Sequence, residues 1–138
     1  MNKPIDPELS ANEILKALEA KESIALVIVG SLIGALPAMA LYILFGVMEG
    51  VLAFFLVLPA FLVAFSARFV GRPFTRSARA IVGVISALVH LGGAVFLFVS
   101  PASFALIPAS FIIGFRFSMA GLTEEEEKAL WRRKRGIR

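Results

Sequence analysis

The chain of 138 residues is long enough for one domain, and 59% of it is hydrophobic while only 17% is charged. Soluble domains are usually about 45–50% apolar and about 25% charged, so this composition, with a mean hydropathy of +0.87, indicates a membrane protein. The absence of cysteine excludes disulfides, thiolate metal sites and cysteine nucleophiles. Because the composition indicates a membrane protein, the net charge of +4 is better interpreted through membrane topology than through nucleic-acid binding.

The tail of residues 1–22 carries a helix-start signal. Ser10 followed by Glu13 fits a capping box, in which each side chain bonds the other residue's backbone N–H. Ile14, Leu15 and Leu18 then form a short apolar stripe. We therefore predict an amphipathic, cytoplasmic N-terminal helix over about 7–21, lying at the membrane surface.

Four apolar segments follow this tail, separated by two short turns and one longer loop. A bilayer core of about 30 Å needs roughly 20 apolar residues per helix, and the backbone must satisfy its own hydrogen bonds there. We therefore predict an all-α membrane protein, a four-transmembrane-helix bundle of two helical hairpins. Its transmembrane domain covers residues 23–122, with spans at about 24–47, 51–67, 80–99 and 102–122.

The basic residues indicate the orientation of these spans. Thirteen of the 14 Lys and Arg residues lie in the two tails or the central loop, and the two short turns hold none. The positive-inside rule then places both termini and the central loop in the cytoplasm, as expected of a multi-pass protein of a bacterial inner (cytoplasmic) membrane. Tyr42 is expected at the outer interface and Trp131 on the cytoplasmic side. The residues expected to fix topology and meet anionic headgroups are Arg68, Arg72, Arg76, Arg79, Arg132, Arg133, Lys134 and Arg135.

The spans contain small residues at helical spacing and three similar proline tripeptides. Small residues four apart let two helix backbones approach, either within the bundle or in a homodimer. Pro37, Pro59 and Pro108 each lie in a Leu/Ile-Pro-Ala tripeptide and are expected to kink their helices. The recurring tripeptide and a repeated Ile-Val-Gly hint at a duplicated hairpin. The predicted helix-packing residues are Gly30, Gly34, Ala38, Gly83, Ala87 and Gly114.

His90 is the only histidine and lies about ten residues into the third predicted span, near the membrane midplane. It shares a helix face with small residues, so it points into the bundle, where burial disfavours its cation and its ring still needs hydrogen-bond partners. The expected partners are Ser110 or the carbonyl of Ile33, which Pro37 frees. His90 then either pins the bundle or lines a polar path, although no second titratable group lies at that depth.

Arg116 is the other charged residue inside a span. Its long side chain can reach the cytoplasmic headgroups, or it can form the charge-selective mouth of an anion pathway. No acidic residue elsewhere in the spans could pair with it. The candidate intramembrane polar site consists of His90, Ser86, Ser110 and Arg116.

The C-terminal tail, residues 123–138, is predicted to be a charged cytoplasmic helix. Thr123 with Glu126 fits a second capping box, and acidic residues precede basic ones in the order that favours the helix dipole. The run is either a solvated helix or a contact for anionic headgroups.

The sequence contains no catalytic motif: no Ser/His/acid set, no HExxH, no Walker loop and no paired carboxylates in the spans. We therefore expect a non-catalytic membrane protein with no cofactor, no metal and no nucleic-acid partner. The favoured function is an accessory or assembly subunit of a membrane complex, in contact with the lipid bilayer and with other subunits or itself. The alternative is a small homo-oligomeric channel or transporter with a pathway near His90.

Overall fold

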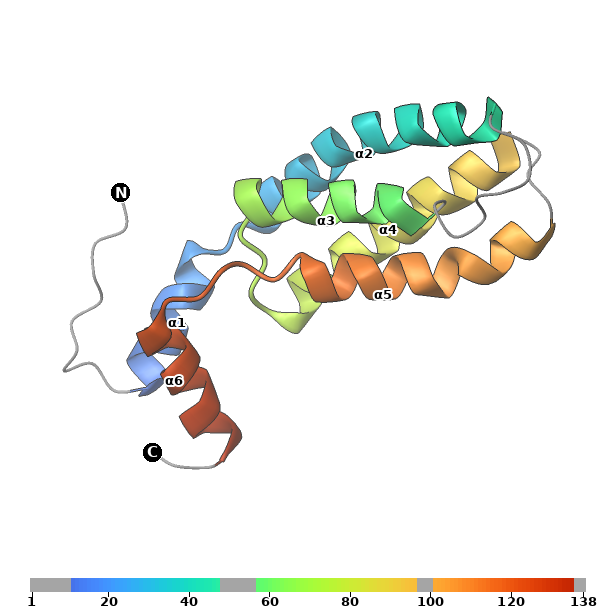
Figure 1. The fold of residues 1–138 in the computed structure, drawn as a ribbon. Coiled ribbons are helices and arrows are strands. Elements are labelled where there is room, and N and C mark those ends of the chain that lie inside the picture. The colour runs from blue at the N-terminus through green and yellow to red at the C-terminus, as the bar shows by residue number, and fades with distance from the viewer. Residues whose placement is uncertain (1–10, 48–56, 97–100, 136–138) are drawn as a thin grey trace. The chain divides into compact units, whose positions relative to one another are not determined.

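The structure is a computed structural model that describes residues 11–47, 57–96 and 101–135, all of them in helices or short connections (Figure 1). The predicted all-α class is confirmed over these ranges. The chain divides into two compact units, residues 1–22 with 121–138, and residues 23–120. In chain order the elements are α1 (Ala11–Lys21), α2 (Ile24–Val47), α3 (Leu58–Val70), α4 (Arg76–Phe96), the 3-10 helix η2 (Pro101–Leu106), α5 (Ile107–Phe117) and α6 (Glu124–Lys134).

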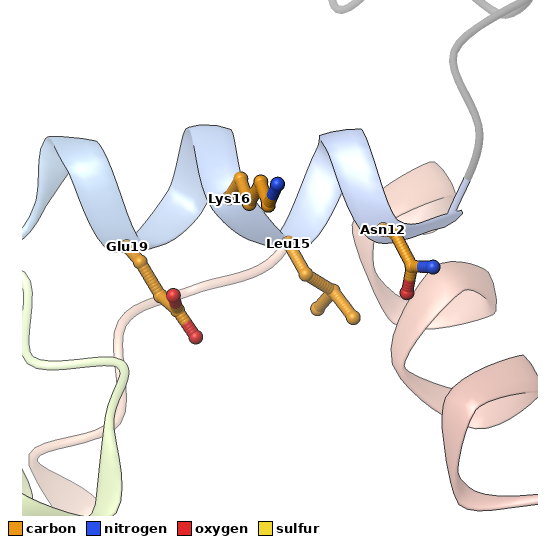
Figure 2. A pocket seen from close by; sticks show the side chains of 4 residues that line it. All are labelled: Asn12, Leu15, Lys16 and Glu19. Carbon is orange, nitrogen blue, oxygen red and sulfur yellow. The ribbon is translucent and has the colours of Figure 1, made fainter.

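The first unit pairs the two terminal helices, α1 and α6. The apolar stripe of α1 is buried, since Ile14, Leu15 and Leu18 are at most 9% exposed, and Ala129 of α6 is buried with them. Residues 7–10 of the predicted helix, with the capping residue Ser10, lie outside the described part of the chain. Figure 2 shows the side chains of α1 that line a pocket: Asn12, Leu15, Lys16 and Glu19.

The start of α6 confirms the second predicted capping box. The Thr123 N–H donates to Oε2 of Glu126 at 2.7 Å, and the Glu126 N–H donates to Oγ1 of Thr123 at 3.4 Å. Glu124 and Lys128, which lie one turn apart on α6, form an ion pair, with Lys128 Nζ 3.0 Å from Glu124 Oε1. The hydrogen bond from Lys128 lowers the pKa of the Glu124 carboxyl.

In the second unit, α2 and α4 are long and apolar enough to cross a membrane, and they are the two such helices in the described residues. They contain 24 and 21 residues. Only 28% and 33% of their apolar windows is buried. Large apolar side chains instead face outward, including Leu36 at 75% and Leu88 at 59% exposure. The interior contains small apolar side chains together with several buried polar groups, among them His90 and Ser86.

The other two predicted spans are shorter as helices. α3 has 13 residues and begins at Leu58, and residues 51–56 of its predicted span lie outside the described ranges. The segment predicted as one helix over 102–122 is η2 followed by α5, which ends at Phe117. Pro108 explains the division, because it has no N–H for an α-helical bond back into η2. The described helices therefore do not show the four full-length spans that were predicted.

The central loop is much shorter than the break in hydrophobicity suggested. Arg68 lies within α3, and both Arg76 and Arg79 lie within α4, so the connection is only residues 71–75. Thr75 begins α4 by accepting the Ala78 N–H with Oγ1 at 3.2 Å. The predicted boundary was wrong because arginine and alanine are good helix formers, so the helix extends beyond its apolar part.

Two of the three prolines do not kink a helix. Pro59 and Pro108 stand in the first turn of α3 and α5, where the missing N–H has no intrahelical partner to lose. Pro37 alone of the three lies inside a helix, α2. The expectation of three kinks was therefore wrong for Pro59 and Pro108.

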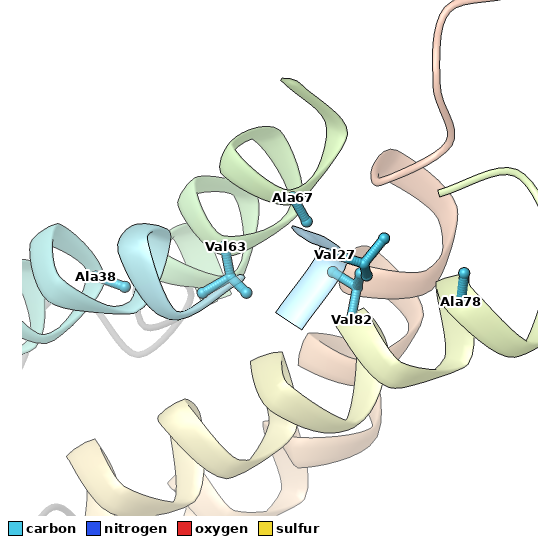
Figure 3. Packing of buried hydrophobic residues seen from close by; sticks show 6 residues of the cluster. All are labelled: Val27, Ala38, Val63, Ala67, Ala78 and Val82. Carbon is cyan, nitrogen blue, oxygen red and sulfur yellow. The ribbon is translucent and has the colours of Figure 1, made fainter. Parts of the chain in front are cut away.

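Close helix packing holds each hairpin together. α2 packs on α3 through glycines, and a β-carbon on Gly34 would lie 2.5 Å from the Leu62 carbonyl oxygen. α4 packs on α5, where a β-carbon on Gly83 would lie 2.9 Å from the Phe111 ring. Between these pairs lies a core of small side chains, shown in Figure 3: Val27, Ala38, Val63, Ala67, Ala78 and Val82.

We predict that Gly34→Ala lowers stability, while Gly92→Ala does not. The new methyl group at residue 34 meets backbone of α3, and overpacking of this kind costs about 1–3 kcal/mol. A β-carbon at Gly92 has no neighbour within 4 Å, so the alanine there is neutral or stabilises the helix slightly. Thermal unfolding in detergent, followed by circular dichroism, measures both. Equal melting temperatures for the two variants would contradict the packing argument.

Candidate functional site

The most polar point of the interior lies where α2, α4 and η2 meet. His90 of α4 has none of its surface exposed, and Tyr42 of α2 has 1%. The Tyr42 hydroxyl lies 2.7 Å from His90 Nδ1, and His90 Nε2 lies 2.9 Å from the backbone oxygen of Ser103 in η2. One imidazole therefore links three segments that are far apart in sequence.

The partners determine which nitrogen carries the proton. A carbonyl oxygen only accepts, so Nε2–H must donate to Ser103. In the neutral ring Nδ1 then has the lone pair, and it accepts the Tyr42 hydroxyl proton. Both ring nitrogens are used, as a buried polar group requires.

Gly93 makes the approach of the Tyr42 ring possible. A β-carbon at this position would lie 2.6 Å from the ring. With glycine there, the ring reaches the next turn of α4 and meets the imidazole edge-on, with centroids 5.6 Å apart and planes at 75°. The sequence contains no signal that an aromatic ring from α2 fills the space beside Gly93.

The predicted partners of His90 were wrong. It bonds the Tyr42 hydroxyl and the Ser103 carbonyl, and neither the Ile33 carbonyl nor Ser110. Tyr42 is buried among the helices, and its depth at the outer interface stays a prediction. The reason lies in the start of α4 at Arg76, four residues before the predicted span. His90 is consequently about 21 Å along its helix, well beyond the middle, at the level where Tyr42 and η2 lie.

Three buried serine hydroxyls have no hydrogen-bond partner in the described part of the chain. They belong to Ser86, Ser103 and Ser110, all at most 1% exposed. Ser86 lies against Gly114 of α5, whose missing side chain leaves room for it. The predicted polar residues Ser86 and Ser110 are thus buried as expected, but His90 does not bond to either hydroxyl.

Arg116 lies apart from the polar centre. Its side chain is exposed on α5. The neighbouring residue, Phe115, instead receives Arg79 of α4, whose Nε donates to the Phe115 carbonyl at 2.9 Å. The Arg79 guanidinium also lies over the Phe115 ring, 4.3 Å from its centroid. Arg79 is therefore a helix-to-helix link, a role that the charge count alone could not reveal.

The predicted packing residues fall into the two hairpins. Gly30 and Gly34 lie against α3, and Gly83 and Gly114 lie at the contact of α4 with α5. Ala38 is fully buried, whereas Ala87 is half-buried. These contacts join helices of one chain.

The basic residues predicted to meet headgroups occupy different environments. Arg68 is half-buried in α3, and Arg72 is exposed in the connection with a left-handed φ of 50°. In α6, Arg135 lies over the Trp131 ring at 3.9 Å, and Arg132 and Lys134 are exposed. The Arg133 side chain lies outside the described residues. No group of three His, Cys, Asp or Glu residues that could hold a metal occurs within the described ranges.

Comparison of the chain with protein-family models, with curated proteins and with solved structures gave no match. The arguments about function therefore depend on the geometry of the helices and of the side chains above.

We predict that His90→Ala lowers the free energy of unfolding by about 1–3 kcal/mol, because it removes the hydrogen bonds that His90 makes to the Tyr42 hydroxyl and to the Ser103 carbonyl. Tyr42→Phe costs about 1 kcal/mol, since one bond is lost. Thermal or denaturant unfolding in detergent measures both.

A double-mutant cycle supplies the control. In the His90→Ala background, Tyr42→Phe should cost little more, because the bond it removes is already gone. Additive losses would mean that the two side chains stabilise the bundle independently.

Proposed function

We propose that the chain is a non-catalytic, four-span subunit of a bacterial inner-membrane complex, with both termini in the cytoplasm. The two long apolar helices provide two spans. η2 and α5 together rise roughly 28 Å, close to a bilayer core, and α3 is the apolar partner of α2. The distribution of basic residues supports the orientation.

The observation that carries this proposal is the state of His90. Its ring is fully buried and both nitrogens are committed to protein partners. A histidine that relays protons must exchange partners with water or with a second titratable group, and the spans offer no acid or lysine for this. Because both nitrogens of the imidazole have protein partners, a packing role is favoured for His90. The close glycine contacts between the helices favour a scaffolding role for the chain.

A second function, a small homo-oligomeric channel or transporter, is favoured by a different observation. The hydroxyls of Ser86, Ser103 and Ser110 are buried without partners in the described ranges. Unsatisfied polar groups in a membrane interior are the kind of lining that a water-filled path would use. Four spans seldom enclose a path alone, so this function requires association of several copies.

We expect the native complex, gently extracted from its own membrane, to contain other subunits when its mass and components are measured. We also expect liposomes that contain only this folded chain to show no ion or solute flux above empty liposomes. The absence of flux follows from the committed ring nitrogens of His90, and the presence of other subunits follows from the proposed scaffolding role.

One result would contradict the proposed role as a subunit. A pure homo-oligomer that conducts under a gradient, with the conductance altered in His90→Ala, would replace the subunit by the channel. A circular dichroism spectrum from the same liposomes ensures that a lack of flux comes from folded protein.

A further inference from the structure

The second unit has a pronounced charge imbalance. Residues 23–120 contain one acidic residue, Glu49, which lies outside the described residues. The basic residues of the same unit are Arg68, Arg72, Arg76, Arg79 and Arg116. Three of them, Arg76, Arg79 and Arg116, come together where α4 begins and α5 ends, and this unit offers no described carboxylate to balance them.

Arg79 is the fixed member of this group. The Phe115 carbonyl is one of the last four of α5, which have no intrahelical partner, and Arg79 Nε satisfies it at 2.9 Å. The guanidinium carbon also lies over the Phe115 ring, 4.3 Å from its centroid, which restricts the motion of the group. With Nε engaged, the two Nη groups remain as a pre-oriented pair of donors.

Arg76 and Arg116 are the basic residues next to this anchor, one on each of the two helices that it joins. Arg76 is one turn before Arg79 on α4, Arg116 follows Phe115 on α5, and both side chains are exposed. Arg79 experiences electrostatic repulsion from both. Three like charges thus lie near enough to repel one another, which costs free energy unless an anion lies among them.

The position on α4 makes the arrangement less favourable still. A helix N-terminus carries a partial positive charge and favours acids, yet α4 has none in its first turn and begins with Arg76. α1 and α6 do the opposite, with Glu13 and Glu124–Glu127 in their first turns. The positive end of α4 therefore adds to the charge of Arg76, whereas the C-terminal end of α5 favours the cations of Arg79 and Arg116.

We propose that Arg76, Arg79 and Arg116 form a binding site for a phosphate group. Guanidinium forks match phosphate oxygens in bidentate geometry, and a helix N-terminus strengthens such a site. The phosphate belongs either to the headgroup of an anionic phospholipid or to a free phosphate ion. This inference goes beyond the proposed function, because it holds for a scaffold subunit and for a channel.

The test uses the full chain, delipidated in a neutral detergent. Native mass spectrometry measures binding of phosphatidylglycerol, phosphatidylcholine or inorganic phosphate, and thermal unfolding gives the stabilisation from each. The variant Arg76→Gln with Arg116→Gln removes two exposed charges and leaves the Arg79 link intact. The matched control, Arg132→Gln with Lys134→Gln, removes two exposed charges from α6.

We expect the wild-type chain to bind phosphatidylglycerol more tightly than phosphatidylcholine. The Arg76/Arg116 variant should bind phosphatidylglycerol about tenfold more weakly or worse, and the α6 control should stay close to wild type. Inorganic phosphate that stabilises the wild type as well as phosphatidylglycerol does, but not the Arg76/Arg116 variant, identifies a free-phosphate site. An effect of phosphatidylglycerol alone identifies a headgroup site.

Two results would overturn the proposal. One is an equal loss of phosphatidylglycerol in both double variants, which means that binding follows net charge. The other is no preference of the wild-type chain for phosphatidylglycerol or phosphate over phosphatidylcholine. Neither result depends on whether the chain conducts ions or associates with other subunits, so the two proposals fail separately.

Discussion

A buried imidazole must place both of its ring nitrogens on partners, and this requirement fixes how the two hairpins meet. His90 stands on α4, but its partners come from α2 and from η2. Any shift of α4 by one turn would move the ring about 5 Å and break both bonds. The glycine contacts determine how close the helices of one hairpin lie, whereas His90 determines the register of one hairpin against the other.

That register also explains the choice of small residues around the imidazole. Without a hydrophobic driving force between helices in lipid, association depends on close contact and on interhelical hydrogen bonds. Gly93 gives the Tyr42 ring its place, and Gly114 gives Ser86 its place. The large apolar side chains consequently face outward, as Leu36 and Leu88 do. The small-residue interior and the large apolar side chains on the outside are two consequences of the same packing.

The sequence predicted the elements better than their ends and contacts. Apolar runs gave α2 within its observed bounds, and the Thr123–Glu126 capping box is present because such a box depends only on neighbours in sequence. The early start of α4 was missed because hydrophobicity marks the membrane rather than the helix. The Tyr42–His90 and Arg79–Phe115 links join residues 48 and 36 positions apart, and no periodicity within one helix carries that information.

The two hairpins follow one plan with one difference at the polar centre. In each, the first helix carries an Ile-Val-Gly whose glycine contacts the second helix, and the second helix begins with proline in its first turn. When the two hairpin sequences are aligned with Gly30 on Gly83, Pro37 of α2 aligns with His90 of α4. One half therefore has a residue that removes a backbone donor where the other half has an imidazole. Two identical hairpins could pair in two alternative arrangements. A single imidazole whose partners lie on α2 and η2 has both of its hydrogen bonds in only one of these arrangements, so His90 selects that arrangement.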